Sequence, residues 1–92
     1  MKENEIMEGM TARYGKNIPQ RMKKLNEEVR ELHNAIAFAS SESILDELAD
    51  VQIIVAHMAH IMGADSQQLI NAAWQKIRRR DIDPTYKHSS RL

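Results

Sequence analysis

Apolar positions in this chain recur every three to four residues, which is the period of an amphipathic α-helix. This pattern predicts a short helix over residues 4–14, a second over 18–39, a third over 44–62 and a fourth from 65 or 66 to about 80. Gly15, the serine-rich segment 40–43 and Gly63 separate these stretches, as expected of turns and helix ends. The sequence has no strand-like alternation and no internal repeat, so we predict an all-α fold, a small helical bundle of three main helices plus a short N-terminal helix.

The third predicted helix is apolar around its whole circumference rather than along one stripe. A helix of this kind is buried on every side, and one chain of this length has too few other helices to bury it. We therefore expect a homodimer or homotetramer in which the bundle is completed by oligomerisation. The residues concerned are Ile44, Leu45, Leu48, Val51, Ile53, Ile54, Val55, Met58, Ile61 and Met62.

Length and composition narrow the class of protein further. The 92 residues suit a single helical domain over 1–80, followed by a polar C-terminal tail over 81–92. Thirteen basic and thirteen acidic residues cancel, so no net charge favours nucleic acid or an anionic membrane. There is no cysteine, no signal-peptide pattern at the N-terminus and no apolar stretch long enough to span a bilayer. We expect a cytoplasmic protein that binds neither nucleic acid nor membrane.

Two acidic clusters stand out within the predicted helices. Glu27, Glu28 and Glu31 belong to the second helix, and Glu47 and Asp50 belong to the third. Residues three and four apart lie on one side of a helix, and an antiparallel pairing of the two helices would bring up to five carboxylates to one gap. So much like charge is unfavourable without a cation, and oxygen ligands suit Mg²⁺ or Mn²⁺.

Each cluster also has a simpler interpretation. The first, taken alone, is typical of a solvent-exposed helix face. The second interrupts a helix of core residues, and a buried carboxylate requires a partner. Basic residues of the second helix could provide salt bridges, and the helix dipole favours acids such as Asp46 and Glu47 near its N-terminus. Asp50 lies too far into the helix for the dipole to account for it.

The two clusters and their spacing carry a family resemblance. The segment from Glu27 to Glu31, fifteen further residues, and the segment from Glu47 to Asp50 resemble the E-E-x-x-E and E-x-x-D motifs of the MazG-like all-α nucleoside triphosphate pyrophosphohydrolases. The flanking residues and the later helix containing Trp74-Gln75-Lys76 are also similar. The resemblance covers roughly residues 18–80 and indicates the superfamily better than the substrate.

The resemblance implies a function and a set of site residues. Enzymes of this group use Mg²⁺ to cleave a nucleoside triphosphate into the monophosphate and pyrophosphate. It implies that Glu28, Glu31, Glu47 and Asp50 bind the metal, and that Glu27 is a further ligand or orients the attacking water. The phosphates would be held by basic residues, for which the candidates are Lys24, Lys76, Arg79 and Arg80. Where related sequences often carry a lysine one turn before Lys76, this chain has Ala73.

Two other functions remain open from the sequence. Phosphoribosyl-ATP pyrophosphatase belongs to the same superfamily, although the Ser-Tyr-Thr segment of that enzyme is not found here. The chain could instead be a non-catalytic helical module that assembles with itself or a partner through salt bridges. Among the remaining residues, His57 is expected in the core or in an interface, and Trp74 is expected to anchor the fourth helix in the core.

Overall fold

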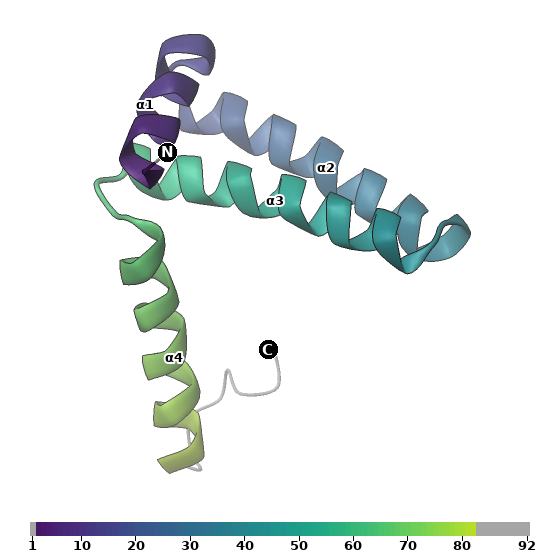
Figure 1. Ribbon diagram of the computed structural model, residues 1–92. Coiled ribbons are helices and arrows are strands. Elements are labelled where there is room, and N and C mark those ends of the chain that lie inside the picture. Colours follow the sequence, from purple (N-terminus) through teal and green to yellow (C-terminus); the bar gives the residue numbers. More distant parts are fainter. Residues whose placement is uncertain (1, 83–92) are drawn as a thin grey trace.

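The computed structural model describes residues 2–82, and they form four α-helices and no strand. In chain order these are α1 (Glu3–Tyr14), α2 (Ile18–Phe38), α3 (Ser41–Ile61) and α4 (Ser66–Ile82). Helices α2 and α3 form a long antiparallel hairpin, α1 lies across the open end of that hairpin, and α4 projects away from it (Figure 1). The predicted all-α fold is confirmed. No helix within residues 2–82 is both long and apolar enough to cross a lipid bilayer.

The helix boundaries follow local capping interactions. The side chain of Asn17 accepts a hydrogen bond from Gln20 N at 3.0 Å at the start of α2. Ser40 caps α3 by accepting from Ser43 N at 3.3 Å, so this helix begins at Ser41, three residues earlier than predicted. Such N-caps satisfy backbone N–H groups that have no partner within the helix. The caps therefore fix the short connection that makes α2 and α3 antiparallel neighbours.

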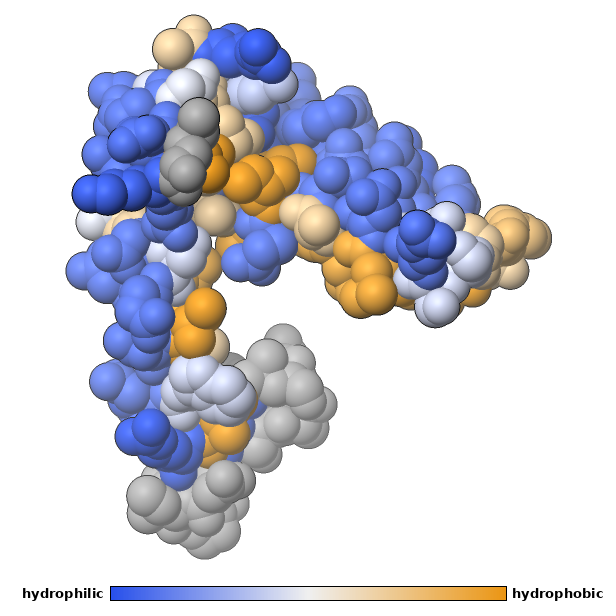
Figure 2. Space-filling model, viewed as in Figure 1, coloured by the Kyte–Doolittle hydropathy of each residue, from blue (hydrophilic) through white to orange (hydrophobic). Residues whose placement is uncertain are grey.

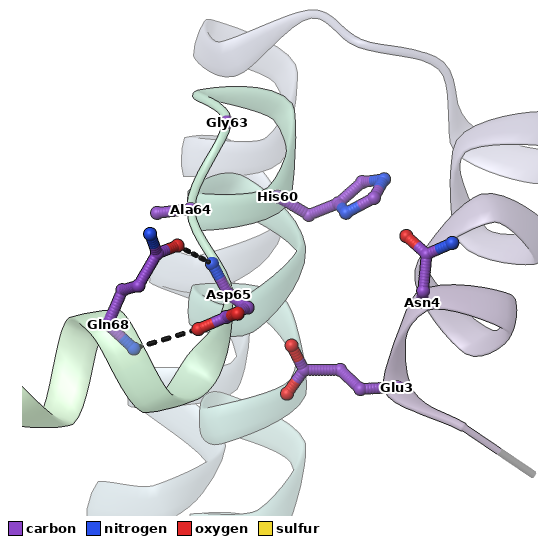
Figure 3. A pocket seen from close by; sticks show the side chains of 7 residues that line it. All are labelled: Glu3, Asn4, His60, Gly63, Ala64, Asp65 and Gln68. Carbon is purple, nitrogen blue, oxygen red and sulfur yellow. Dashed lines mark hydrogen bonds between the residues drawn. The ribbon is translucent and has the colours of Figure 1, made fainter.

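The turn between α3 and α4 is also built from local signals. Gly63 has a positive φ of 91°, a conformation that glycine adopts without strain. Asp65 and Gln68 then form a reciprocal capping box, in which Gln68 N donates to Asp65 Oδ1 and Asp65 N donates to Gln68 Oε1, both at 2.8 Å (Figure 3). Helix α4 continues to Ile82, two residues past the predicted boundary at 80, and the rest of the predicted tail (83–92) lies outside the described residues.

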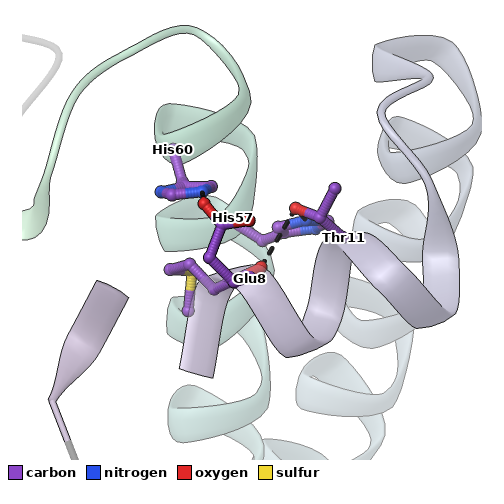
Figure 4. Close-up of polar contacts among 5 residues, drawn as sticks. Glu8, Thr11, His57 and His60 are labelled. Atoms are coloured by element: carbon purple, nitrogen blue, oxygen red, sulfur yellow. Dashed lines mark hydrogen bonds and ion pairs between the residues drawn. The ribbon is translucent and has the colours of Figure 1, made fainter. Parts of the chain in front are cut away.

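The best-buried part of the chain lies where α1 packs on the end of α3. Met7 is 1% exposed and His57 is completely buried. Thr11 Oγ1 donates its single hydroxyl hydrogen to Met7 O at 3.0 Å, so His57 Nε2, 3.1 Å away, is the donor to Thr11 Oγ1 (Figure 4). His60, on the same helix, pairs with Glu8 at 3.2 Å. The structure thus places His57 in the core, as expected, and shows that it fastens α1 to α3.

A single chain leaves much apolar surface uncovered on α3 and α4. Leu45 is 67% exposed and Leu48 46% exposed, although the sequence places them on a helix of core type. Trp74 is 56% exposed, so the prediction that it anchors α4 in the core is wrong for one chain. The reason is that α4 turns away from the hairpin, with apolar side chains along its inner side (Figures 1 and 2).

Candidate metal centre

Three carboxylates meet across the α2–α3 hairpin. Glu28 projects from α2, and Glu47 and Asp50 project from successive turns of α3. One oxygen of each lies within 4.8 Å of the others. The antiparallel pairing of the two helices produces this arrangement, because it sets the first acidic cluster opposite the second. Three of the five predicted carboxylates therefore share one gap.

Two oxygens in this cluster are buried without a hydrogen-bond partner. Glu28 is only 7% exposed; its Oε1 accepts from Lys24 Nζ at 3.2 Å, while its Oε2 has no partner within the described part of the chain. Glu47 Oε2 is buried and unpartnered in the same way. A buried carboxylate oxygen without a donor costs free energy unless a proton or a cation satisfies it. A divalent cation bound between these carboxylates would satisfy both oxygens.

The charge around Glu47 leads to the same conclusion. Its partial removal from solvent, and the neighbouring carboxylates of Glu31, Asp50, Glu28 and Asp46 in that order, raise the pKa of Glu47 above its ordinary value. Both causes favour the protonated acid over the anion. A bound divalent cation would reverse this balance, because it stabilises the charged form of each carboxylate around it.

The donor set fits a hard divalent ion. All donors in the cluster are carboxylate oxygens, which suit Mg²⁺ and Mn²⁺ rather than softer transition metals. Mg²⁺ in particular is commonly held by a few carboxylates while substrate phosphates and water complete its coordination. Glu28, Glu47 and Asp50 could hold such an ion from one side and leave its other side open to substrate.

The two remaining acidic candidates lie at the edge of the cluster. Glu31, one turn after Glu28 on α2, is exposed and is not among the three oxygens that converge, but it is close enough to raise the pKa of Glu47. Glu27 points to solvent, with its side chain 59% exposed and 3.5 Å from Lys24 Nζ. Within one chain, Glu27 therefore lies outside the three converging carboxylates and pairs with Lys24 instead.

The predicted basic residues fall into two groups. Lys24 lies beside the cluster, and its pKa is raised by its hydrogen bond with Glu28, by the charge of Glu28 and, more weakly, by Glu27. Lys76, Arg79 and Arg80 lie on α4, which leads away from the hairpin (Figure 1). The structure of one chain therefore brings Lys24 to the carboxylates and leaves the three basic residues of α4 elsewhere.

A cleft beside the carboxylates contains residues that sequence reasoning missed. It has a volume of about 400 Å³ and lies between α1, α2 and α3; its lining includes Tyr14 and Arg21 together with Lys24, Glu28 and Asp50. Arg21 is 6% exposed, and its guanidinium lies 4.8 Å from the centre of the Tyr14 ring. Arg21, Lys24 and Glu28 follow each other at three- and four-residue steps on α2, so helical spacing could have identified Arg21.

Comparison with known proteins supports a family assignment. The family model described as the MazG nucleotide pyrophosphohydrolase domain matches residues 17–84, which include α2, α3 and α4. No curated protein and no solved structure matches the chain. The match covers both acidic segments and most of the chain, and the structure is all-α, as that domain is. The chain therefore belongs to the MazG nucleotide pyrophosphohydrolase family.

Proposed function

We propose that this protein is a Mg²⁺-dependent nucleoside triphosphate pyrophosphohydrolase. Its substrate is a ribo- or deoxyribonucleoside triphosphate, and its products are the nucleoside monophosphate and pyrophosphate. The observation that carries the proposal is the pair of buried, unpartnered oxygens on Glu28 and Glu47, which meet Asp50 across the hairpin. These residues lie in the two acidic segments covered by the family match.

Each acidic residue has a role in this proposal. Glu28, Glu47 and Asp50 bind the metal, with Mn²⁺ as a possible substitute, and Glu31 extends the site on its exposed side. Glu27 accepts a hydrogen bond from the attacking water and orients it. When bound, the metal neutralises charge on the phosphate oxygens and lowers the pKa of a coordinated water. Glu28, Glu47 and Asp50 would hold that ion in a fixed place, and this would help to orient the phosphate chain for attack by water.

The basic residues that contact the phosphates come from two copies of the chain in this proposal. Lys24 is adjacent to the carboxylates and can contact the phosphates directly after exchanging its bond with Glu28. Lys76, Arg79 and Arg80 reach a site only if α4 packs against another protomer. The exposed Trp74 and the apolar inner side of α4 favour such packing, because a surface of this kind is usually covered in an assembly. We therefore propose a homodimer or homotetramer.

The decisive experiment is a panel of ribo- and deoxyribonucleoside triphosphates, with phosphoribosyl-ATP included, assayed for pyrophosphate release with Mg²⁺. We expect turnover of at least one triphosphate, with the monophosphate as the second product. Turnover of phosphoribosyl-ATP alone would assign the chain to the related pyrophosphatase. Glu31→Gln and Asp50→Asn are expected to abolish release while the helical circular dichroism signal is retained.

Two controls distinguish a hydrolase from a non-catalytic helical interaction module. Glu42→Gln removes a carboxylate from the first turn of α3, away from the cluster, and should leave release unchanged. If the panel shows no release, and neither Mg²⁺ nor Mn²⁺ changes the thermal unfolding midpoint, the hydrolase proposal fails. The chain would then be a helical interaction module whose carboxylates have no metal-binding role.

A further inference from the structure

Arg21 is the most unusual charged residue outside the acidic cluster. It is 6% exposed, its Nε is buried with no hydrogen-bond partner, and it forms no ion pair within residues 2–82. The proximity of its charge also contributes to lowering the pKa of the buried His57. A guanidinium is always charged and carries five N–H donors. Burying one with an unused donor is unfavourable, so its position requires an explanation.

The contact with Tyr14 explains where Arg21 lies, but it gives the N–H donors of the guanidinium no hydrogen-bond acceptor. The guanidinium carbon lies 4.8 Å from the ring centroid, a distance at which a cation is attracted to the face of an aromatic ring. The face of a ring accepts none of the in-plane N–H groups at the edge of the guanidinium. The stacking therefore fixes the plane of Arg21 and leaves an edge for a ligand with oxygen acceptors.

The carboxylates in the same cleft do not provide those acceptors. Arg21, Glu28 and Asp50 all line the cleft of about 400 Å³, yet Arg21 is not ion-paired with either acid within the described residues. The cation and the anions thus border one space without neutralising each other. A phosphate group fits that space chemically, because it can meet the guanidinium directly and the carboxylates through a divalent cation.

We propose that Arg21, oriented by Tyr14, is a phosphate-binding residue of the metal cleft and grips the pyrophosphate portion of the substrate. This inference rests on the proposed function for the identity of the substrate, and it assigns a residue that is not among the basic candidates from the sequence. The residue that orients it, Tyr14, ends α1 and precedes the family match, which begins at residue 17. The N-terminal helix thereby contributes to substrate binding.

The test measures binding of inorganic pyrophosphate by calorimetry with Mg²⁺ present, using the full chain. Arg21→Gln is expected to raise the dissociation constant about 10- to 100-fold, the range for losing hydrogen bonds to a charged group. Arg21→Lys keeps the charge without the planar donor pair, so its dissociation constant for pyrophosphate should lie between those of Arg21→Gln and the wild type. Mn²⁺ binding without pyrophosphate, followed by electron paramagnetic resonance, should be the same in all three proteins.

Arg13→Gln is the matched control. Arg13 also lies near Tyr14, with 6.0 Å from its guanidinium carbon to the ring centroid, but it is exposed and borders a different hollow. This variant should bind pyrophosphate as the wild type does. If Arg13→Gln and Arg21→Gln weaken pyrophosphate binding equally, the effect comes from the lost positive charge alone, and the proposal is overturned. If Arg21→Gln does not fold, Arg21→Lys decides: weaker binding supports the proposal and unchanged binding overturns it.

Two outcomes separate this inference from the proposed hydrolase function. Arg21-dependent pyrophosphate binding by a protein that hydrolyses no nucleotide supports the phosphate site and rejects the hydrolase. Nucleotide hydrolysis combined with unchanged pyrophosphate binding in Arg21→Gln rejects the phosphate site alone. A wild type that does not bind pyrophosphate with Mg²⁺ also overturns the role of Arg21.

Discussion

Replacing Asp50 with asparagine should make the protein more stable than the wild type without metal and less stable than the wild type with metal. The substitution keeps the size of the side chain and removes one charge from the cluster. Asp50 forms no ion pair within residues 2–82, so no salt bridge is lost there. Without metal, we expect Asp50→Asn to be more stable than the wild type because repulsion has been relieved.

The size of this effect follows from the spacing of the charges. The oxygens of Glu28 and Asp50 lie within 4.8 Å of each other. At this separation two unit charges repel by about 1 kcal/mol at the dielectric constant of water and about 3.5 kcal/mol at an effective value of about 20. Lys24 offsets part of the charge of Glu28, so we expect the low end, about 1 kcal/mol. For a domain of this size that is a rise of about 4–8 °C in the unfolding midpoint.

Added metal should stabilise the wild type more than Asp50→Asn. At a free Mg²⁺ or Mn²⁺ concentration about 100 times the dissociation constant, binding stabilises the wild type by about 2.7 kcal/mol. Asp50→Asn lacks one ligand and should gain much less, so the wild type becomes the more stable protein. The assay is thermal unfolding by circular dichroism at pH 7, with and without metal.

Asp46→Asn is the control for charge alone, since it removes a carboxylate from α3 one turn before Asp50 and outside the three converging oxygens. It should keep the metal-induced rise in the unfolding midpoint. The metal-site interpretation is refuted if Asp50→Asn is less stable than the wild type without metal, or if metal raises the midpoints of both proteins equally.

Three further predictions concern the core, the pH response and the assembly. Thr11→Val removes the acceptor of the buried His57 Nε2 and should cost about 1–3 kcal/mol in urea unfolding, whereas Thr11→Ser should cost much less. Burial, the charge of Arg21 and His60 lower the pKa of His57; protonation then favours the unfolded chain, so stability should fall as the pH drops below about 6.5. His57→Gln should show a flatter profile between about pH 7.5 and 5.5 than the wild type, and an equal slope would contradict this reasoning. Trp74→Glu should shift an assembled protein toward monomer in analytical ultracentrifugation, and a wild type that sediments as a monomer would refute the proposed assembly.

The elements were predictable because their signals are local. Asn17, Ser40 and Asp65 cap helices through contacts within three residues, and the short link after α2 leaves few choices besides an antiparallel hairpin. Once the hairpin is fixed, opposing Glu28 to Glu47 and Asp50 follows from spacing along each helix. The extent of the carboxylate cluster was less predictable, because the rotation of α2 about its own axis decides that Glu28 faces α3 while Glu27 faces solvent.

The direction of α4 and the role of α1 could not be read from the sequence. The pattern around Trp74 indicates an apolar stripe, but it does not say which molecule covers that stripe. Similarly, Tyr14 and Arg21 come together because α1 crosses the end of the hairpin, where Met7 and His57 hold it. That crossing depends on packing between segments about 50 residues apart in the chain. Periodicity describes each helix singly and contains no information on such contacts.

The distribution of charge in the cleft favours the proposed binding site over a structural ion pair between Arg21 and the acids. A fold stabilised by Arg21 and the acids would bring them into contact, since a buried salt bridge repays its desolvation only in good geometry. Here Arg21 stacks on Tyr14, while Glu28 and Glu47 each keep a buried oxygen unpartnered. The positive charge of Arg21 and the negative charges of the carboxylates are therefore kept apart, which lowers the stability of the fold. A ligand that carries a divalent cation at one end and phosphate oxygens at the other would satisfy both at once, which is the chemistry of a metal-bound nucleoside triphosphate.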